Sequence, residues 1–248
     1  MVSIIDSGYL IHYKFYSCLT WLSFQKDVTE DEKEIPLTHA GYKKTFENSI
    51  RKIFKYESKK SEKIFYAMES RNNWRKTIYP EYKATRKKKK SNCIGECFSI
   101  AENIIKTEFP NVVLLHEDSM EADDVIAKKY YELMKNTDVA VKIMTSDSDF
   151  FQLKENSEDN SILLVNIKNK ENKNKTDLYG EQYLIHKSIH GDTADNIFPI
   201  VRGYGSTKKK QKFYNMIINN ETNDFEKDIN DKYKLNRSLI DLRKYKFA

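Results

Sequence analysis

Four short apolar runs along the chain each lead into polar residues. The runs are Val2 to Ile5, Lys63 to Met68, Val112 to Leu115 and Val139 to Met144. Short apolar runs with polar boundaries are typical of buried strands. Asp6 follows the first run, Glu69 follows the second, and Asp147 and Asp149 follow the fourth. We therefore predict strands that carry carboxylates at their carboxyl ends.

Two segments between these runs repeat apolar residues at helical spacing. Residues 39–57 place five of them on one face, namely Tyr42, Phe46, Ile50, Ile53 and Phe54. Residues 120–134 do the same with Ala122, Val125, Ile126 and Leu133. Strands that alternate with helices predict an α/β fold, a mostly parallel sheet flanked by helices. Because ligands of such sheets bind outside the carboxyl ends of the strands, the acids lie where a site is expected.

A further acidic group, Glu121-Ala122-Asp123-Asp124, opens the second predicted helix. Glu121 and Asp124 are three residues apart, so they share a helix face, while Ala122 turns toward the core. Acids in a first helical turn can simply complement the helix dipole. The helix dipole does not explain the acids at the strand ends. Those carboxylates would repel one another unless cations bind between them.

Divalent metal ions would remove this repulsion and supply chemistry. Hydrolysis of a phosphodiester needs a nucleophile made from water and relief of charge on the leaving oxygen, and a pair of divalent ions roughly 3.5 to 4 Å apart supplies both. Carboxylate oxygens suit magnesium, which keeps several waters and uses few direct carboxylates. The acids therefore indicate metal-dependent hydrolysis of phosphodiesters.

The segment from Arg71 to Lys90 has nine basic residues and a single acid, Glu81, interleaved with the aromatic residues Trp74, Tyr79 and Tyr82. Basic side chains neutralise phosphates, and aromatic rings stack on unpaired bases. The alternative is a solvated lysine-rich loop, which is as good an interpretation of residues 86–90 taken alone. The aromatic spacing favours nucleic-acid binding by the segment as a whole.

Two later segments differ in composition. Residues 168–177 alternate Lys and Asn and are expected to form an exposed loop without a specific role. Residues 180–212 are expected to form a small helical module that contains Gly191-Asp192-Thr193-Ala194-Asp195-Asn196. Farther on, Gly203 and Gly205 precede Ser206 and three lysines, a turn whose backbone NH groups can face a phosphate.

Composition excludes several classes of protein. The chain has 248 residues with 39% hydrophobic and 32% charged residues, and no apolar run is long enough to span a bilayer. Its start lacks a basic segment, so we expect no signal peptide and a cytoplasmic location without membrane partners. Cys18, Cys93 and Cys97 are expected to be reduced thiols, and with His116 they do not complete a zinc pattern. The net charge of +6 favours a polyanionic partner.

The motifs in their order along the chain resemble one family, the 5′ to 3′ exonucleases and flap endonucleases of phages and bacteria, particularly the phage ribonuclease H type. The resemblance covers most of the chain. Its elements are Asp6, Glu69, Trp74-Arg75, Tyr82-Lys83-Ala84-Thr85-Arg86, Glu121-Ala122-Asp123-Asp124, Thr145-Ser146-Asp147-Ser148-Asp149 and Gly191-Asp192-Thr193-Ala194-Asp195-Asn196. Each element is short, and only the ordered set is specific.

The resemblance implies a PIN-like core, a helical arch or clamp and a DNA-gripping module. We expect the core in residues 1–179, with the basic arch at about 71–92. Residues 180–248 are expected to form a helix-three-turn-helix DNA-binding module and a helical tail. Family members often continue beyond the segment that ends at Asp241, so we expect a partner-binding tail to be missing here. The protein partner considered for this chain is a single-strand-binding or clamp protein.

The resemblance also implies roles for individual residues. Two Mg²⁺ or Mn²⁺ ions would be bound directly by Asp6, Glu69, Glu121, Asp123 and Asp147. The second ion would be held partly through water by Asp124, Asp149, Asp192 and Asp195. Lys83 and Arg86 would meet the scissile phosphate, and Tyr82 would stack on a terminal base. The nucleic-acid contacts expected in all are Arg71, Trp74, Arg75, Lys76, Tyr82, Lys87, Lys88, Gly203, Gly205, Ser206, Lys208 and Lys209.

Two departures from the family pattern bear on these roles. Glu69 stands where the family usually carries Asp. Its longer side chain would change the spacing between the metal ions or make its contact with a metal ion through water. We expect nuclease activity to survive this difference. Arg202-Gly203-Tyr204-Gly205 is a looser version of the family's Gly-Ile-Gly turn, so potassium at this turn is the least supported of the implied ions.

The function expected is that of a structure-selective 5′ nuclease that releases products with 5′-phosphates. Its substrates would be DNA with a 5′ flap or nick, or an RNA-DNA hybrid, during removal of primers or flaps in replication or repair in a bacterium or phage-infected cell. One alternative is a structure-specific DNA-binding protein with weak or lost catalysis, which would need missing acids. Another is a PIN-type ribonuclease for single-stranded RNA, although such chains lack the module of residues 191–212. A small-molecule phosphohydrolase would not need the basic segment.

Overall fold

A parallel sheet is the centre of the computed structural model, which describes residues 1–86, 93–135, 139–203, 205–219 and 226–247. Within them five strands pair in the order β3-β2-β1-β4-β5, all parallel. The strands are β1 (Val2–Asp6), β2 (Lys63–Ala67), β3 (Val112–Leu115), β4 (Val141–Met144) and β5 (Ile162–Val165). The predicted parallel α/β fold and its first four strands are confirmed, and β5 was not predicted.

The chain divides into two compact units. One, the sheet unit, comprises Met1–Asn72, Lys89–Ser146 and Asn160–Asn172. The other, the helical unit, comprises Asn73–Lys88, Asp147–Asp159 and Lys173–Ala248. Both units draw on separate stretches of sequence, whereas the domains predicted from the sequence follow one another along the chain and meet at residue 179.

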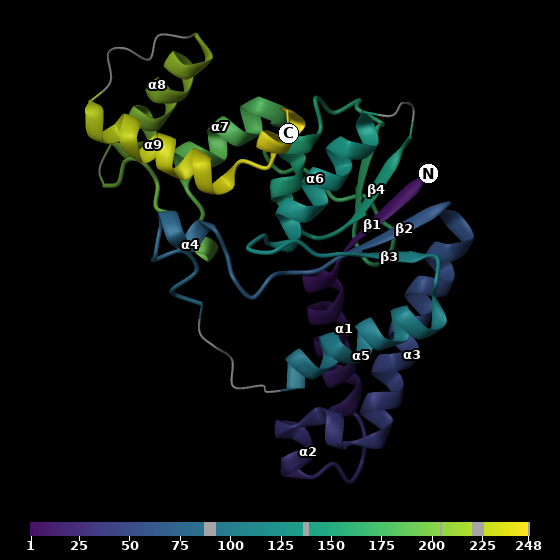
Figure 1. The fold of residues 1–248 in the computed structure, drawn as a ribbon. Coiled ribbons are helices and arrows are strands. Elements are labelled where there is room, and N and C mark those ends of the chain that lie inside the picture. Colours follow the sequence, from purple (N-terminus) through teal and green to yellow (C-terminus); the bar gives the residue numbers. More distant parts are fainter. Residues whose placement is uncertain (87–92, 136–138, 204, 220–225, 248) are drawn as a thin grey trace. The chain divides into compact units, whose positions relative to one another are not determined.

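Helices cover both faces of the sheet in the sheet unit. On one face lie α1 (Ser7–Leu22), α3 (Ala40–Lys60) and α5 (Cys93–Glu108), and α6 (Ala122–Met134) lies on the other (Figure 1). Short helices, α2 (Glu30–Glu34) and the 3₁₀ helix Pro36–Thr38, connect α1 to α3. Since successive strand residues point to opposite faces, Ile5 packs in the core under α1, α3 and α5, whereas Phe65 meets Lys129 of α6.

The apolar faces of the two predicted helices are buried. On α3 the side chains of Tyr42, Phe46, Ile50 and Phe54 have no exposed surface, which confirms that face, while Ile53 is only half-buried. On α6 the predicted face is correct for Ala122, Val125 and Ile126, but Leu133 is half-buried because it lies in the last turn, near the helix end at Met134.

A buried ion pair joins α3 to the middle of the sheet. Lys142 Nζ of β4 lies 2.6 Å from Glu57 Oε2 of α3, and both side chains are almost completely buried. Ser3 Oγ of β1 donates to the same Glu57 oxygen at 2.9 Å. Glu57 Oε1 is also buried and has no hydrogen-bond partner. This carboxylate therefore depends on Lys142 for its stability.

Replacing Lys142 by Met is expected to lower the free energy of unfolding by about 3 to 5 kcal/mol, because a buried carboxylate would lose its cation. The double variant Glu57→Leu/Lys142→Met should recover most of that loss, since it removes both charges. Urea unfolding of the two variants and the wild type measures the difference. Equal destabilisation by the single and double changes would show that the lysine acts through packing instead.

The Lys/Asn-rich segment is a largely exposed loop, as predicted, and it has structural contacts that the prediction did not include. Asn172 Nδ2 donates to the Thr145 carbonyl at 2.8 Å, directly after β4, and its backbone N donates to Leu164 of β5 at 2.9 Å. Just before this segment, Ile167 N donates to Tyr9 Oη at 3.1 Å. The asparagine amides satisfy backbone groups, a function that composition alone does not reveal.

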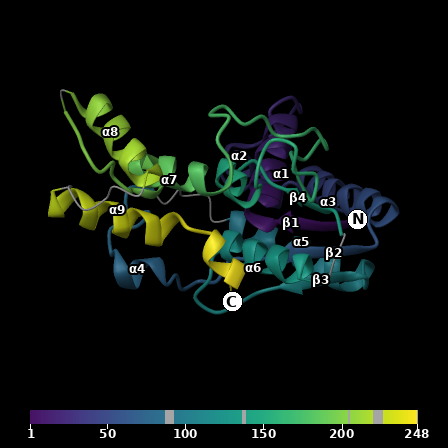
Figure 2. The same cartoon turned by 90° about the horizontal axis from the view of Figure 1, so that it is seen from above.

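The helical unit is built around α7 (Gly180–His190), α8 (Ser206–Ile218) and α9 (Lys227–Ile240). Its shorter elements are α4 (Arg75–Ile78) and the 3₁₀ helices Ser148–Leu153, Thr193–Asp195 and Arg243–Phe247. Figures 1 and 2 both show α7 beside α9, and these helices are in contact. Gly191 ends α7 with φ 72°, and a Cβ there would collide with the Ile197 carbonyl oxygen.

Several other sequence predictions concern local chemistry. All three cysteines are free and buried, as expected of reduced thiols. Among the described residues, none of the helices combines the length and apolar character needed to cross a bilayer. The segment from α7 to α8 contains helices, as expected for the predicted helical module. The assignment of this segment as a helix-three-turn-helix stays a prediction. Of the predicted arch, α4 and the turns up to residue 86 are described, and residues 87–92 lie outside.

Candidate active site

Asp6 is the last residue of β1 and the N-cap of α1. One carboxylate oxygen, Oδ1, accepts from Tyr9 N at 3.0 Å, which caps the helix. The other, Oδ2, accepts from Thr145 Oγ1 at 2.9 Å, directly after the neighbouring strand β4. The residue is only 7% exposed. The sequence thus places a buried carboxylate at the carboxyl edge of the sheet, held by two neutral donors.

The loop after β2 carries Glu69 and is bonded to the segment that precedes α6. Ser70 N donates to the Met120 carbonyl at 2.9 Å, and Ser70 Oγ accepts from Ser119 N at 3.1 Å. Glu69 itself is exposed. Because Ser70 follows Glu69 and Met120 precedes Glu121, these bonds connect the backbones that carry the two glutamates at the same edge of the sheet.

The acidic group at the start of α6 includes two buried carboxylates. Asp124 is fully buried and Glu121 is 7% exposed, whereas Asp123 is half-buried. Glu121 is the N-cap, so it precedes the helix, and its backbone N donates to Asp124 Oδ2 at 3.2 Å. This group therefore caps the helix, and metal binding by the same carboxylates stays a prediction.

In the helical unit, a lysine lies between two of the predicted metal ligands. Lys187 Nζ of α7 is 2.7 Å from Asp149 Oδ1 and 2.8 Å from Asp192 Oδ2. Asp147 is exposed and caps the 3₁₀ helix Ser148–Leu153, where its Oδ1 accepts from Asp149 N at 2.8 Å. Lys187 was not predicted as a site residue. Lys187 therefore relieves part of the repulsion between Asp149 and Asp192.

The two neighbouring aspartates favour the charged form of Lys187. Burial alone would lower the pKa of its amine, but the carboxylates of Asp149 and Asp192 raise that pKa above its ordinary value. Burial and the Asp147 carboxylate raise the pKa of Asp149, which Lys187 counteracts in part. Burial would also raise the pKa of Asp192, yet Lys187 holds it below its usual range. Asp192 is therefore a carboxylate at neutral pH.

Replacing Lys187 by Met should lower the free energy of unfolding in chelator by about 1 to 3 kcal/mol, less than for a fully buried pair because the groups are partly exposed. Excess Mg²⁺ should raise the Tm of this variant more than that of the wild type, since a cation that binds only the folded protein stabilises it. Melting with and without Mg²⁺ measures both effects, with Lys212→Met on exposed α8 as control. The same Mg²⁺-dependent shift in all three proteins would contradict a bridging role.

The predicted phosphate contacts Lys83 and Arg86 both meet Asp195. Arg86 Nη2 is 2.6 Å from Asp195 Oδ1, and Lys83 Nζ is 3.9 Å from Asp195 Oδ2. Tyr82 Oη donates to the same Oδ2 at 2.8 Å. Lys83 has a positive φ of 57°, and its backbone N donates to the Asp195 carbonyl. The turn therefore presents two cations beside one acid of the predicted metal set.

Residues of the basic aromatic segment differ in burial and in contacts. Arg75 is buried, with Nε donating to the Leu239 carbonyl at 2.7 Å, and the Tyr82 ring packs in a core with Leu184. Two cations contact the Trp74 ring, with Lys244 Nζ 3.6 Å and Arg75 Cζ 4.6 Å from its centroid. Arg71 and Lys76 are exposed, and Lys87 and Lys88 lie outside the described residues.

The glycine turn leads directly into α8. Gly203 and Gly205 have φ of 87° and 74°, and Gly205 is the N-cap of the helix that begins at Ser206. Lys208 and Lys209 are exposed in the first turn of α8, which contains no acid. Cations at a helix N-terminus are unfavourable with respect to the helix dipole, and an anion there would offset this cost.

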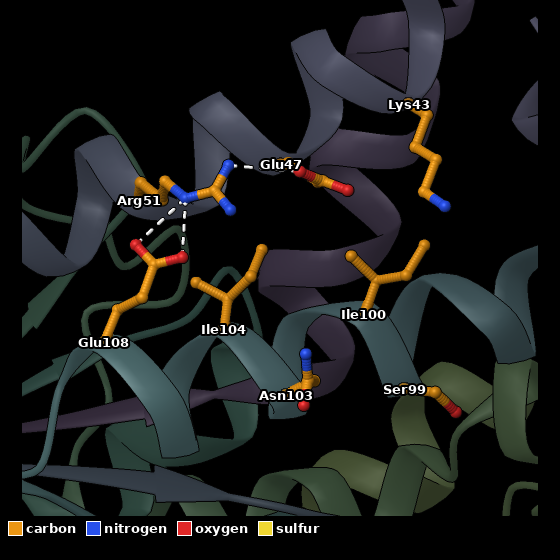
Figure 3. A pocket seen from close by; sticks show the side chains of 8 residues that line it. All are labelled: Lys43, Glu47, Arg51, Ser99, Ile100, Asn103, Ile104 and Glu108. Atoms are coloured by element: carbon orange, nitrogen blue, oxygen red, sulfur yellow. Dashed lines mark hydrogen bonds and ion pairs between the residues drawn. The ribbon is translucent and has the colours of Figure 1, made fainter. Parts of the chain in front are cut away.

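A separate pocket of the sheet unit lies between α3 and α5 (Figure 3). Arg51 Nε donates to both oxygens of Glu108 at 2.9 and 3.0 Å, and its Nη1 donates to Glu47 at 3.1 Å. The other lining residues are Lys43, Ser99, Ile100, Asn103 and Ile104. Both pocket carboxylates bind the same guanidinium, so this pocket is unlike the acidic edge of the sheet.

Carboxylate chemistry fits a hard divalent cation at the sheet edge. Asp6, Glu121 and Asp124 supply buried oxygen donors there, which is the ligand type that Mg²⁺ prefers. Within the stretches that the structure describes, no three His, Cys, Asp or Glu side chains are grouped closely enough to form a metal site. The assignment of all nine acids to two ions therefore stays a prediction.

A parallel sheet with helices on both faces and carboxylates at the carboxyl ends of its strands places the sheet unit in the α/β class of proteins. The family model of the 5′-3′ exonuclease N-terminal resolvase-like domain matches residues 1–189, and the chain belongs to this family. The resemblance inferred from the motifs is thereby confirmed.

Two curated relatives are named 5′-3′ exonuclease. The protein of Mycoplasma pneumoniae is 32% identical over 144 residues, covering 54% of this chain and 47% of its own length. That of Buchnera aphidicola subsp. Schizaphis graminum is 31% identical over 203 residues, covering 78% of this chain and 63% of its own length. The chain thus spans about half to less than two thirds of these relatives.

Solved structures from bacteriophage T5 have the same fold. A flap endonuclease in a pseudo-enzyme-product complex with DNA and metal ions has a TM-score of 0.63 and 18% identity, and the match covers 98% of this chain and 90% of that one. A 5′-exonuclease with bound zinc has a TM-score of 0.67 and 17% identity, with the same coverage. At this identity the likeness supports the fold alone.

Proposed function

We propose that the protein is a divalent-metal-dependent 5′ nuclease that hydrolyses phosphodiester bonds at or near a 5′ end. The observation that carries the proposal is the set of buried carboxylates, Asp6, Glu121 and Asp124, at the carboxyl edge of the parallel sheet. Carboxylate oxygens are the ligands that Mg²⁺ prefers in proteins. Membership in the exonuclease family supports a role for these acids in the proposed hydrolysis.

The acids proposed to hold Mg²⁺ or Mn²⁺ fall into two sets. Those of the sheet unit are Asp6, Glu69, Glu121, Asp123 and Asp124. Those of the helical unit are Asp147, Asp149, Asp192 and Asp195. When bound, two divalent ions would activate water and offset charge on the leaving oxygen. Thr145 and the backbone of Tyr9 orient the Asp6 carboxylate for that task.

Lys83 and Arg86 are proposed to bind the scissile phosphate. Both cations lie near the Asp195 carboxylate, and a phosphate would compete with this carboxylate for them. Arg86 is 54% exposed at its side chain and can reach a ligand in solvent. A guanidinium suits this role because it can donate two parallel hydrogen bonds to phosphate.

The N-terminus of α8 is proposed as a second phosphate contact, away from the reacting bond. Gly203 and Gly205 would present backbone NH groups, and Ser206, whose own NH donates to the Gly203 carbonyl, would add its hydroxyl. Lys208 and Lys209 would add charge, so the contact would be independent of sequence. A potassium ion at this turn belongs to the same proposal. Arg71, Trp74 and Lys76 would bind nucleic acid through the basic segment.

The substrates proposed are DNA with a 5′ flap or a nick and RNA-DNA hybrids, with products that carry 5′-phosphates. The T5 flap endonuclease structure, which contains DNA and metal ions, supports the choice of substrate by analogy. Removal of RNA primers or flaps during replication in a bacterial or phage-infected cytoplasm would be the biological role. A single-strand-binding or clamp protein would be the partner.

Three labelled substrates test the proposal. A 5′-labelled flap, a nicked duplex and an RNA-DNA hybrid are incubated with the protein and Mg²⁺, and the products are resolved by length and end group. We expect cleavage near the 5′ end and 5′-phosphate products. Tight binding of the flap without cleavage would favour a DNA-binding protein, and cleavage restricted to single-stranded RNA would favour a PIN-type ribonuclease.

A further inference from the structure

Asn196 closes the loop that carries two of the proposed metal ligands. Asp192 and Ile197 exchange both backbone hydrogen bonds at 2.8 Å, so the residues between them form a closed loop. The proposed ligands are Asp192 and Asp195, and Asn196 follows them as the C-cap of the 3₁₀ helix Thr193–Asp195. Asn196 is only 8% exposed, and its backbone is left-handed, with φ 61° and ψ 25°. Asparagine is one of the few residues with a side chain that adopts this conformation readily.

The amide of Asn196 reaches the turn that holds the proposed phosphate contacts. Asn196 Nδ2 donates to the Glu81 carbonyl oxygen at 2.9 Å. Beside this bond, Lys83 N donates to the Asp195 carbonyl oxygen, also at 2.9 Å. Tyr79 Oη donates to the Asn196 carbonyl oxygen at 3.2 Å. These hydrogen bonds join two segments of the helical unit that are far apart in the sequence.

Lys83 has an uncommon backbone conformation in this turn. Six described residues other than glycine have a positive φ, and two of them, Lys83 at 57° and Asn196 at 61°, meet here. A residue with a side chain keeps such a conformation only where the surrounding structure imposes it, and such residues gather at functional sites. The Lys83 ammonium lies 3.9 Å from Asp195 Oδ2 and 5.0 Å from the centroid of the Tyr82 ring. The backbone of the turn therefore sets the direction of this cation.

We propose that Asn196 is a positioning residue for Lys83. Its amide, bonded to the Glu81 carbonyl, holds the turn in the left-handed conformation that places the Lys83 ammonium beside Asp195. Lys83 then meets the scissile phosphate at a fixed place relative to the acids of the same loop. The inference rests on the proposed nuclease function, in which Lys83 binds that phosphate. Asn196 acts through Lys83 and does not touch the substrate.

Glycine at this position separates the amide from the backbone. A left-handed conformation alone does not require asparagine, because glycine adopts it more readily. The hydrogen bond to the Glu81 carbonyl oxygen is the contact that glycine cannot make. Asn196→Gly therefore removes the amide and keeps a backbone conformation that the loop can use.

Cleavage rates in two backgrounds test the inference. Single-turnover cleavage of a 5′-labelled flap is measured at saturating DNA and Mg²⁺. In the wild-type background, Asn196→Gly should lower the rate at least about tenfold, because displacing a contact at the reacting group can cost on the order of 10²-fold. In the Lys83→Ala background the same change should cost less than about threefold, since the cation that Asn196 positions is already absent. The Kd for the flap in excess chelator should change little.

Trypsin provides a second readout that needs no cleavage of DNA. The rate of cutting after Lys83, followed by mass, should rise at least about fivefold in Asn196→Gly, because proteolysis requires local opening of the turn. Asn169→Gly is the matched control, since Asn169 is also left-handed, with φ 55°, and its Oδ1 accepts from Lys142 Nζ at 3.3 Å. This control should leave both rates unchanged.

Two results would overturn the inference. Equal losses of rate in the wild-type and Lys83→Ala backgrounds would show a general structural role for Asn196, and unchanged tryptic cutting after Lys83 would show that the amide does not hold the turn. Asn196→Asp serves if the glycine variant melts early, because aspartate tolerates the left-handed conformation and its carboxylate cannot donate. Absence of cleavage by the wild type with Mg²⁺ would instead contradict the nuclease proposal, and the tryptic rates would still decide the role of Asn196.

Discussion

Asp147→Asn is expected to slow cleavage about 10⁴-fold, the scale on which single catalytic carboxylates act in hydrolases, while DNA binding stays the same or improves. Asparagine keeps the size of the side chain but removes the negative charge needed to hold a cation. Removing that charge also removes repulsion of the substrate phosphates, so affinity should not fall. Asp123→Asn is expected to behave in the same way at the start of α6.

Single-turnover rates and Kd values for both variants separate the two effects. Asp231→Asn is a suitable control, because Asp231 is an exposed carboxylate on α9 and should leave both quantities unchanged. If a folded Asp147→Asn or Asp123→Asn variant lost binding and turnover equally, these acids would be structural.

Lys83→Ala and Arg86→Ala should each lower the single-turnover rate by at least ~10²-fold, the scale of a lost transition-state donor. Each change removes a charge-assisted contact to the phosphate, and added substrate cannot replace a contact at the reacting group. Both changes also remove a partner of Asp195, so the melting temperature of each variant should be measured beside its rate.

Replacing Lys87 to Lys90, which lie outside the described residues, provides the contrast. This four-lysine variant should bind more weakly and with a flatter salt dependence, because fewer counterions are released. Its rate at saturating substrate should change little. Loss of the saturated rate in this variant, with normal rates for Lys83→Ala and Arg86→Ala, would reverse the roles assigned to the two groups.

Much of the sheet could be predicted from the sequence because its strands are short and apolar on both faces. Strand β5 (Ile162–Val165) was missed although it is as short and apolar as β3 and β4. Only the 3₁₀ helix Ser148–Leu153 lies between β4 and β5, so the alternation of strands with α-helices does not indicate this strand. Helix α1 was also missed. Its exposed side carries tyrosines instead of charged residues, so the contrast between faces that reveals α3 is weak.

For the site, sequence patterns located acids better than they located their partners. The carboxylates of β1 and α6 lie at the sheet edge as expected, because parallel strands end at a common edge. Lys187 gave no signal, since a lysine within His186-Lys187-Ser188 resembles a solvated helix residue until the fold brings it to Asp149 and Asp192. Arg75 shows the converse: its position in a basic run suggested DNA contact, yet it is buried against Leu239.

Metal dependence tests the central claim most directly. A 5′-labelled flap is incubated with protein from which metal has been removed by excess chelator, and Mg²⁺ is then added back in steps. We predict no cleavage in chelator and recovery of the full rate with Mg²⁺, because the proposed site offers carboxylates to hold metal ions. Full turnover in excess chelator would contradict a nuclease that depends on its acidic residues to bind metal.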